Sequence, residues 1–202
     1  MRVVNIEVLI EKWFNKKISL ERIEKYCQQL KIEKRGLLED LTSENIRISC
    51  VQRQVHPVNS IERYIDILCG FVEQAAREDS RLIVFPEYNF FDLLGLIPGF
   101  NFLNQILNKR AVKAKDREKD REGESNLKRE NNFLTTIFKG VAKPIEAGIK
   151  RIFSLLAKEY GIYIYSGSYI LKEKEEIYNA GSLFDPEGNL IGTQKKIHLT
   201  DF

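Results

Sequence analysis

The fold is decided by the stretch Arg81-Leu82-Ile83-Val84-Phe85-Pro86-Glu87, which holds four consecutive apolar residues. An uninterrupted apolar run of this length is typical of a strand that is covered on both faces. Proline has no N–H group to donate to a β-ladder, so the strand should end at Pro86 and present Glu87 just beyond it. The sequence therefore predicts a buried strand over residues 81–86 with a carboxylate at its exit.

The residues before this strand predict a strand and a helix. Apolar and polar side chains alternate over 46–52, as in a strand. Asn59 and Glu62 have the spacing of a capping box, and apolar residues then recur at helical spacing as far as Arg77, which predicts a helix over 59–77. The order strand, helix, strand favours a layered α/β fold.

The residues after the strand predict another helix and a run of antiparallel strands. Pro144 suits a helix start and Gly161 a helix end, so we expect a helix over 145–160. Charged and turn-forming residues then separate further strand-like segments. The predicted strands are 162–171, 177–184 and 190–194.

Residues 1–45 and 109–130 differ in composition from the rest. The first segment reads as helical up to a break at Gly36, and we interpret it as an N-terminal extension for packing or interaction, because it is short for an independent domain. The second holds fifteen charged residues out of twenty-two and predicts an exposed insertion, either a solvated helix or a disordered loop. A specific contact with an acidic partner or a membrane surface is its alternative interpretation.

Composition excludes several functional classes. The chain has 202 residues, 43% of them hydrophobic and 30% charged, as in a soluble globular protein. Its net charge of +3 comes entirely from the insertion, so no nucleic-acid surface is expected. The longest uncharged stretch, 93–108, is shorter than the roughly 20 apolar residues that a spanning helix needs. The opening residues do not resemble a secretory signal, so we expect a cytoplasmic protein.

The cysteines and histidines predict neither a metal site nor a disulfide framework. Cys27, Cys50 and Cys69 have no CxxC spacing, and we interpret them as reduced, buried or incidental thiols. His56 is expected to be a loop residue. No metal and no cofactor are predicted.

Glu87 and Lys196 are the candidate catalytic residues, and it is their combination that carries the hypothesis. Taken singly, an acid after a strand is more often a cap or half of a surface ion pair, and a lysine is more often solvated. Together, Phe85-Pro86-Glu87 and Lys196-Ile197-His198-Leu199 resemble the glutamate and lysine elements of the nitrilase superfamily of carbon–nitrogen hydrolases. Residues 46–52 are similar to that family's opening strand, and 178–188 to the hairpin before its lysine. Lys196 is preferred over Lys195 because only Lys196 has His198 and Leu199 at the family's offsets.

This resemblance implies a fold and a reaction. The fold would be a four-layer α-β-β-α sandwich over 46–202, with Glu87 and Lys196 approaching each other at one end of the sheet. The reaction would be hydrolysis of a non-peptide C–N bond in a small amide, carbamoyl compound or nitrile. Glu87 would act as general base for a cysteine, and Lys196 would stabilise the oxyanion. His198 would orient the lysine loop. The apolar residues 90–107 follow Glu87, and from this position we interpret them as a pocket wall or lid, with contact with a membrane surface as the alternative.

The family's nucleophile follows its lysine element, and no cysteine of this chain occupies that position. We therefore expect the domain to be C-terminally incomplete and inactive alone, with a C-terminal fragment or a homo-oligomer as its partner. The alternative hypothesis is a non-catalytic binding or regulatory protein that retains the front half of the fold. The coding sequence directly downstream discriminates the two, because only a hydrolase needs a further cysteine-bearing segment.

Limited proteolysis should cut first between Lys109 and Glu130. Ordering the backbone costs about 1–2 kcal/mol per residue, and a segment with so few apolar side chains has little to offset that cost. The cleavage sites can be located by mass spectrometry of the first fragments. Resistance of this segment, with cleavage elsewhere, would show that it is docked against a surface that the sequence does not reveal.

Overall fold

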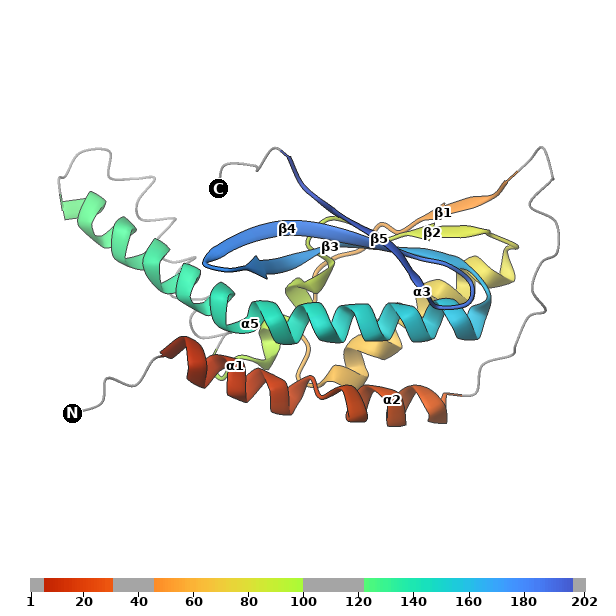
Figure 1. Ribbon diagram of the computed structural model, residues 1–202, viewed down its shortest axis with the longest axis horizontal. Helices are drawn as coiled ribbons and strands as arrows, with labels where there is room; N and C mark the ends of the chain where they lie inside the picture. The colour runs from red at the N-terminus through yellow and green to blue at the C-terminus, as the bar shows by residue number, and fades with distance from the viewer. Residues whose placement is uncertain (1–5, 31–45, 100–121, 198–202) are drawn as a thin grey trace.

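The computed structural model describes residues 6–30, 46–99 and 122–197, with side chains from residue 135 onward in the last range. Its centre is a five-stranded sheet with the order β1-β2-β3-β4-β5 (Figure 1). The strands are β1 (Ile48–Cys50), β2 (Leu82–Val84), β3 (Tyr163–Glu173), β4 (Glu176–Phe184) and β5 (Leu190–Lys195). All the predicted strands are therefore present, and the expectation of a mixed α/β fold is confirmed.

β4 is the one strand of this sheet that runs opposite to the other four. β1, β2 and β3 are parallel neighbours, whereas β3, β4 and β5 form an antiparallel meander. The helix that connects β1 to β2 is α3 (Ile61–Arg77), and α5 (Glu122–Tyr160) leads into β3. Because β1, β2 and β3 are parallel, the segments that leave β1 and β2 emerge at the same end of the sheet.

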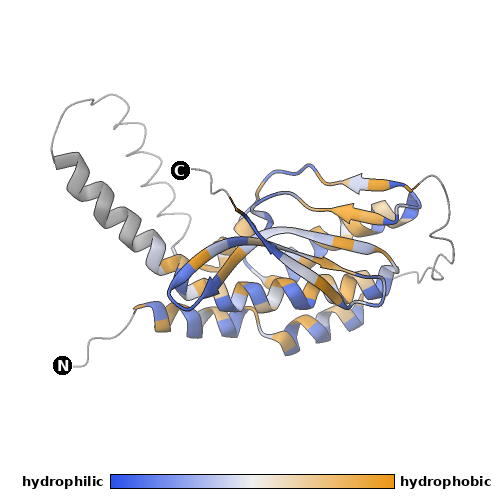
Figure 2. Ribbon diagram, turned by 45° about the horizontal axis from the view of Figure 1, so that its top comes forward, coloured by the Kyte–Doolittle hydropathy of each residue, from blue (hydrophilic) through white to orange (hydrophobic). Residues whose placement is uncertain are grey.

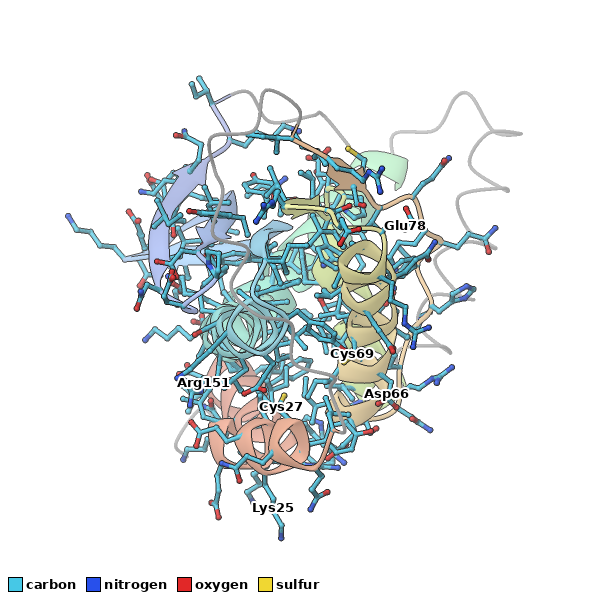
Figure 3. The ribbon with its side chains drawn as sticks, turned by 90° about the vertical axis from the view of Figure 1, so that its right-hand side faces the viewer. Lys25, Cys27, Asp66, Cys69, Glu78 and Arg151 are labelled. Atoms are coloured by element: carbon cyan, nitrogen blue, oxygen red, sulfur yellow. The ribbon has the colours of Figure 1, made fainter. Side chains whose placement is uncertain are left out.

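The helices lie on one side of the sheet. Figures 1 and 3 show α3 and α5 side by side beneath it, and α1 (Ile6–Lys17) and α2 (Leu20–Gln29) beyond them. The amphipathic character of α1, α2 and α5 is visible as alternating hydrophobic and hydrophilic residues in Figure 2. The described residues thus contain one sheet with helices on one face, and the four-layer sandwich stays a prediction.

One continuous core joins these layers. Phe153 on α5 packs against Phe85 at a ring-centroid distance of 5.0 Å and against Phe184 at 6.4 Å. Phe14 and Ile23, from the two N-terminal helices, are fully buried in the same cluster. The described part of residues 1–45 is therefore helical, and it packs against the rest of the chain.

The expectation that a helix begins after Pro144 is wrong. Pro144 lies inside α5, which begins at Glu122 and so includes the end of the charged segment. A proline within a helix removes one backbone hydrogen bond. The apolar stripe nevertheless continues across it, with Val141 before and Ile145 after both fully buried. Tertiary packing therefore outweighs the local penalty.

The predicted capping box at Asn59 is also wrong, because the helix begins two residues later. Ser60 is the N-cap of α3, and its side chain accepts a hydrogen bond from the Arg63 N–H at 3.2 Å. Glu62 instead forms an ion pair with Arg22 of α2. Serine and asparagine cap helices equally well, so the sequence alone did not distinguish the two positions.

The segment after Glu87 is part of the core in its first half. Residues 89–96 form the 3-10 helix η1 (Asn89–Leu96), in which Phe90, Leu93 and Leu94 are buried. Residues 100–107 lie outside the described residues, so the pocket-wall or lid interpretation applies to them only as a prediction.

Among the described residues, no helix combines the length and apolar character needed to cross a bilayer.

A buried polar network fixes η1 to the segment that leaves β1. Asp92 is fully buried and forms an ion pair with Arg53, whose side chain is 6% exposed. The other Asp92 carboxylate oxygen accepts the backbone N–H of His56 at 2.7 Å. Arg53 also donates to Asn89 Oδ1 at 2.8 Å. These bonds hold the exits of β1 and β2 together.

Asp92→Leu should lower the free energy of unfolding by roughly 3–5 kcal/mol, because it leaves the buried Arg53 guanidinium without its carboxylate. Urea denaturation followed by circular dichroism measures this loss. Glu73→Ala, which breaks the exposed Arg77–Glu73 pair, is the control and should cost no more than about 0.5 kcal/mol. The double variant Arg53→Met/Asp92→Leu should be more stable than Asp92→Leu alone; equal or lower stability would contradict the unpaired-charge explanation.

Candidate active site

Glu87 and Lys196 meet at one end of the sheet. Lys196 Nζ donates a hydrogen bond to Glu87 Oε1 at 2.7 Å. Asn179 Nδ2, from β4, donates to the same oxygen at 2.9 Å. Glu87 follows β2 and Lys196 follows β5, so residues more than a hundred positions apart in the sequence are brought together by the sheet order. The two candidate residues therefore lie where the sequence analysis expects them to lie.

The backbone on both sides of Glu87 is held by Ser168 of β3. The Ser168 N–H donates to the Pro86 carbonyl at 3.3 Å, and the Ser168 hydroxyl accepts the Tyr88 N–H at 2.8 Å. Tyr88 has a φ of 57°, in the left-handed region that non-glycine residues rarely adopt. Ser168 thus fixes the turn that leads the chain from β2 into η1.

Gly167 provides the space for this turn. A Cβ atom at residue 167 would lie 2.1 Å from the Pro86 carbonyl oxygen, and the φ of Gly167 is +68°. β3 also has a register irregularity between Tyr165 and Ser168, which bends the strand at this point. A side chain at residue 167 would push away the segment that carries Glu87.

Lys196, the residue directly after β5, is positioned by a backbone hydrogen bond to β4. Its N–H donates to the Asn179 carbonyl at 2.7 Å, directly after the ladder between β4 and β5. The neighbouring Lys195 turns to other partners, because its ammonium pairs with Glu173 and lies 4.3 Å from the centre of the Tyr178 ring. Of the two lysines, Lys196 is the one in contact with Glu87.

The contact between these groups raises the pKa of Lys196. The main cause is the hydrogen bond with the Glu87 carboxylate; burial acts in the opposite direction, and the negative charge of Glu87 adds to the increase. The Lys196 and Glu87 side chains are 31% and 45% exposed. Solvent therefore screens the pair, which is a charged surface-cleft contact and not a buried salt bridge.

The pair lines a cleft of about 240 Å³. Its other walls come from β3 and β4 and from the ends of β2 and β5, and the lining residues include Phe85, Tyr165, Gly167, Ser168, Asn179, Gly181 and Gln194. A larger cavity of about 720 Å³ lies between α3 and the segment after β1, with His56 in its wall. The residues that line this larger cavity include no acid, so it offers no comparable pair.

None of the three cysteines lines the 240 Å³ cleft. Figure 3 shows Cys27 and Cys69 among the helices, where burial raises the pKa of both thiols, that of Cys27 to about 11. A raised pKa keeps a thiol protonated and unreactive at neutral pH. Cys50 is exposed on the edge strand β1. No described group of three or more histidine, cysteine or acidic side chains is arranged to hold a metal ion.

A carboxylate and an ammonium in one cleft define a class of site. The carboxylate can accept a proton from a nucleophile, and the ammonium can donate to an oxygen on which negative charge develops. Acyl transfer to a nucleophile requires both of these capabilities. The described cleft contains no thiol to serve as that nucleophile.

The family profile described as Carbon-nitrogen hydrolase matches residues 13–201. The chain therefore belongs to the carbon–nitrogen hydrolase family, and the predicted membership of the nitrilase superfamily is confirmed. His198 and Leu199, which distinguish Lys196 from Lys195 by sequence, lie outside the described residues.

Curated relatives include omega-amidases. The chain is 39% identical over 69 residues to omega-amidase NIT2 of Danio rerio, a match that covers 34% of this chain and 25% of the relative. It is 33% identical over 155 residues to omega-amidase NIT2 of Bos taurus, covering 77% of this chain and 41% of the relative. The chain thus spans about two fifths of the length of the longer-matching relatives.

Solved structures of the family are also similar. An amidase from Nesterenkonia sp. has 17% identity and a TM-score of 0.49, and the match covers 77% of this chain and 44% of that one. A carbon-nitrogen hydrolase from Helicobacter pylori G27 has 18% identity and a TM-score of 0.48, with coverage of 77% and 41%.

Asn179, Ser168 and Gly167 belong to the site but were not among the residues predicted for it from the sequence. Two signals were available for Asn179: it lies in the stretch 178–188 that resembles the family's hairpin, and it is an asparagine within a predicted strand, where asparagine is depleted. The partner of its side chain is 92 residues away in the sequence, so no local pattern could identify it.

Gly167→Ala should destabilise the chain more than Gly161→Ala does. Both glycines have positive φ values, +68° and +61°, so both alanines carry a conformational cost of about 1–2 kcal/mol. Only at residue 167 does the added methyl group also collide with a backbone oxygen, which should cost about 1–3 kcal/mol more; around Gly161 the space is open. Urea denaturation of both variants measures the difference, and equal losses would show that the Pro86 segment moves away freely.

Proposed function

We propose that this chain is the front part of an amide hydrolase that cleaves a non-peptide C–N bond in a small molecule. Glu87 is its general base and Lys196 its oxyanion stabiliser. The observation that supports this proposal is the 2.7 Å contact between Lys196 Nζ and Glu87 Oε1 in the cleft at the end of the sheet. The omega-amidase relatives favour an amide over a nitrile as the substrate.

The proposed nucleophile is a cysteine from outside residues 1–202, in the same polypeptide or in another. None of this chain's cysteines lines the cleft, and two of them are buried with raised pKa values. The same outside segment would add the second sheet and helix layer of the four-layer sandwich. Figure 1 shows the helices on only one side of the sheet, which leaves the other side for that segment.

The proposed reaction has two stages. Glu87 takes the thiol proton, and the thiolate attacks the amide carbon while Lys196 donates to the oxygen that becomes negative. The C–N bond breaks, the departing nitrogen takes the proton from Glu87, and an acyl-thioester remains. Glu87 then removes a proton from a water molecule, which attacks the thioester and releases the acid and the thiol.

A second candidate function is non-catalytic binding or regulation. The absence of a cysteine from the cleft favours it, since the described residues hold the base and the ammonium but not the nucleophile. In this case the cleft would bind an amide without cleaving it. The two candidates differ in whether a supplied cysteine segment produces turnover.

The purified 202-residue chain should not hydrolyse simple amides, carbamoyl compounds or nitriles, whereas a fused protein should. The fusion joins this chain to the part of the bovine omega-amidase NIT2 that follows its matched segment. In the fusion, Glu87→Gln should lower kcat by roughly 10²–10⁴-fold and Lys196→Met by roughly 10²–10³-fold. Ammonia release, measured with a coupled assay, gives the rates.

Lys195→Met is the matched control and should retain activity, because Lys195 points to Glu173 and Tyr178. A loss with Lys195→Met and none with Lys196→Met would reverse the assignment. Turnover by the chain alone that disappears in Cys50→Ala would show that Cys50 is the nucleophile. A folded fusion that binds amides without turnover would favour the binding function.

A further inference from the structure

We propose that Asn179 is a positioning residue that holds the Glu87 carboxylate against Lys196. This inference rests on the proposed function, because it assigns Asn179 a role in preparing the base. Asn179 does not touch the reacting atoms in the proposed mechanism. It acts through Glu87 and Lys196.

Asn179 contacts both candidate catalytic residues, one through its side chain and one through its backbone. Its Nδ2 donates to Glu87 Oε1 at 2.9 Å, and its carbonyl accepts the Lys196 N–H at 2.7 Å. A single residue in the middle of β4 therefore fixes the direction of the Glu87 side chain and the path of the backbone at Lys196. The relative position of the base and the ammonium depends on it.

Glu87 determines the orientation of the Asn179 side-chain amide. Asn179 is 9% exposed, and its Oδ1 is buried without a hydrogen-bond partner among the described residues. A buried carbonyl oxygen without a partner is unfavourable, so the amide is not oriented to satisfy its own oxygen. Turning the amide over would place Oδ1 against the negatively charged Glu87 Oε1. The observed orientation is therefore the one that lets the amide donate to the Glu87 carboxylate.

Both donors meet on the same carboxylate oxygen. Lys196 Nζ and Asn179 Nδ2 bind Oε1, so Oε2 is the oxygen to which the proposed mechanism assigns the thiol proton. The Glu87 side chain is 45% exposed and would otherwise be able to rotate into solvent. A second donor from a buried strand residue restricts this rotation. It thereby keeps Oε2 directed to one place.

The test follows the pKa of Lys196 by NMR, using the side-chain Cε–H signals of the full chain across a pH titration. Glu87→Gln is the reference variant and should lower the pKa of Lys196, because the main cause of its increase is removed. Asn179→Leu keeps the branched shape of the side chain but removes the donor. It should shift the pKa of Lys196 in the same direction as Glu87→Gln, and Asn179→Ala should do likewise.

Asn189→Ala is the matched control. Asn189 Nδ2 also donates to a carboxylate, that of Asp185 at 3.0 Å, but it lies in the turn between β4 and β5. Its removal should leave the Lys196 titration unchanged. A shift with Asn189→Ala as large as that with Asn179→Leu would show that the effect is general loosening of the β4–β5 hairpin, and it would overturn the proposal.

Two further outcomes decide the proposal. An unchanged Lys196 pKa in a folded Asn179 variant, together with a shifted one in Glu87→Gln, would show that Glu87 stays in place without Asn179 and would overturn it. If Asn179→Leu does not fold, as judged by its amide spectrum, Asn179→Ala carries the same decision. An unchanged pKa in Glu87→Gln would show that the pair does not form in solution, which also overturns the proposal.

Turnover tests the same role separately. In the active fusion, Asn179→Leu should lower kcat by roughly tenfold to a hundredfold with little change in KM, because a misdirected base slows the chemical step. The NMR titration needs no substrate and no cysteine. An inactive fusion would therefore contradict the proposed hydrolase function and leave the positioning role of Asn179 to be decided by the titration alone.

Discussion

The packing of Phe85 against α5 is the contact on which the position of the site depends. Phe85 is 2% exposed and lies between Phe71, at a ring distance of 6.4 Å, and Phe153, at 5.0 Å. Its N–H still bonds to β3, but the next residue is Pro86, which has no N–H to continue the ladder. The chain must therefore leave the sheet one residue after a firmly anchored aromatic ring. Glu87 emerges at a fixed point for this reason.

Two separate sets of polar contacts fix the path of the backbone where the chain leaves β2. On one side, the buried Arg53–Asp92 pair ties η1 to the segment after β1. On the other, Ser168 binds the backbone before and after Glu87. Neither set of contacts includes the Glu87 side chain. These contacts therefore position the backbone around Glu87, whereas the Glu87 carboxylate is held by Asn179 and Lys196. Stability and site geometry can thus be altered by different substitutions.

The sequence predicted the elements whose signals are local, and it missed those that depend on tertiary contacts. Continuous or alternating apolar runs located the five strands that the structure describes. A motif of neighbouring residues selected Lys196 over Lys195. The helix start predicted at Pro144 was wrong because the local preference of proline takes no account of tertiary contacts. Packing between α1 and α5 lets the helix continue across Pro144. Asn179 was missed because hydrogen-bond partners distant in sequence leave no periodic pattern. The catalytic roles of Glu87 and Lys196 stay predictions.

The exposure of the pair explains why the proposed enzyme needs more than a nucleophile from its remaining part. A carboxylate and an ammonium that are 45% and 31% exposed interact through a high effective dielectric constant, which weakens both their attraction and the field that Lys196 exerts on a developing oxyanion. Excluding water from the cleft would strengthen these interactions without moving either group. In the proposed enzyme, a segment that brings the cysteine across the open side of the cleft would therefore also cover the pair. The nucleophile and the low-dielectric environment would then arrive together, and neither would be useful without the other.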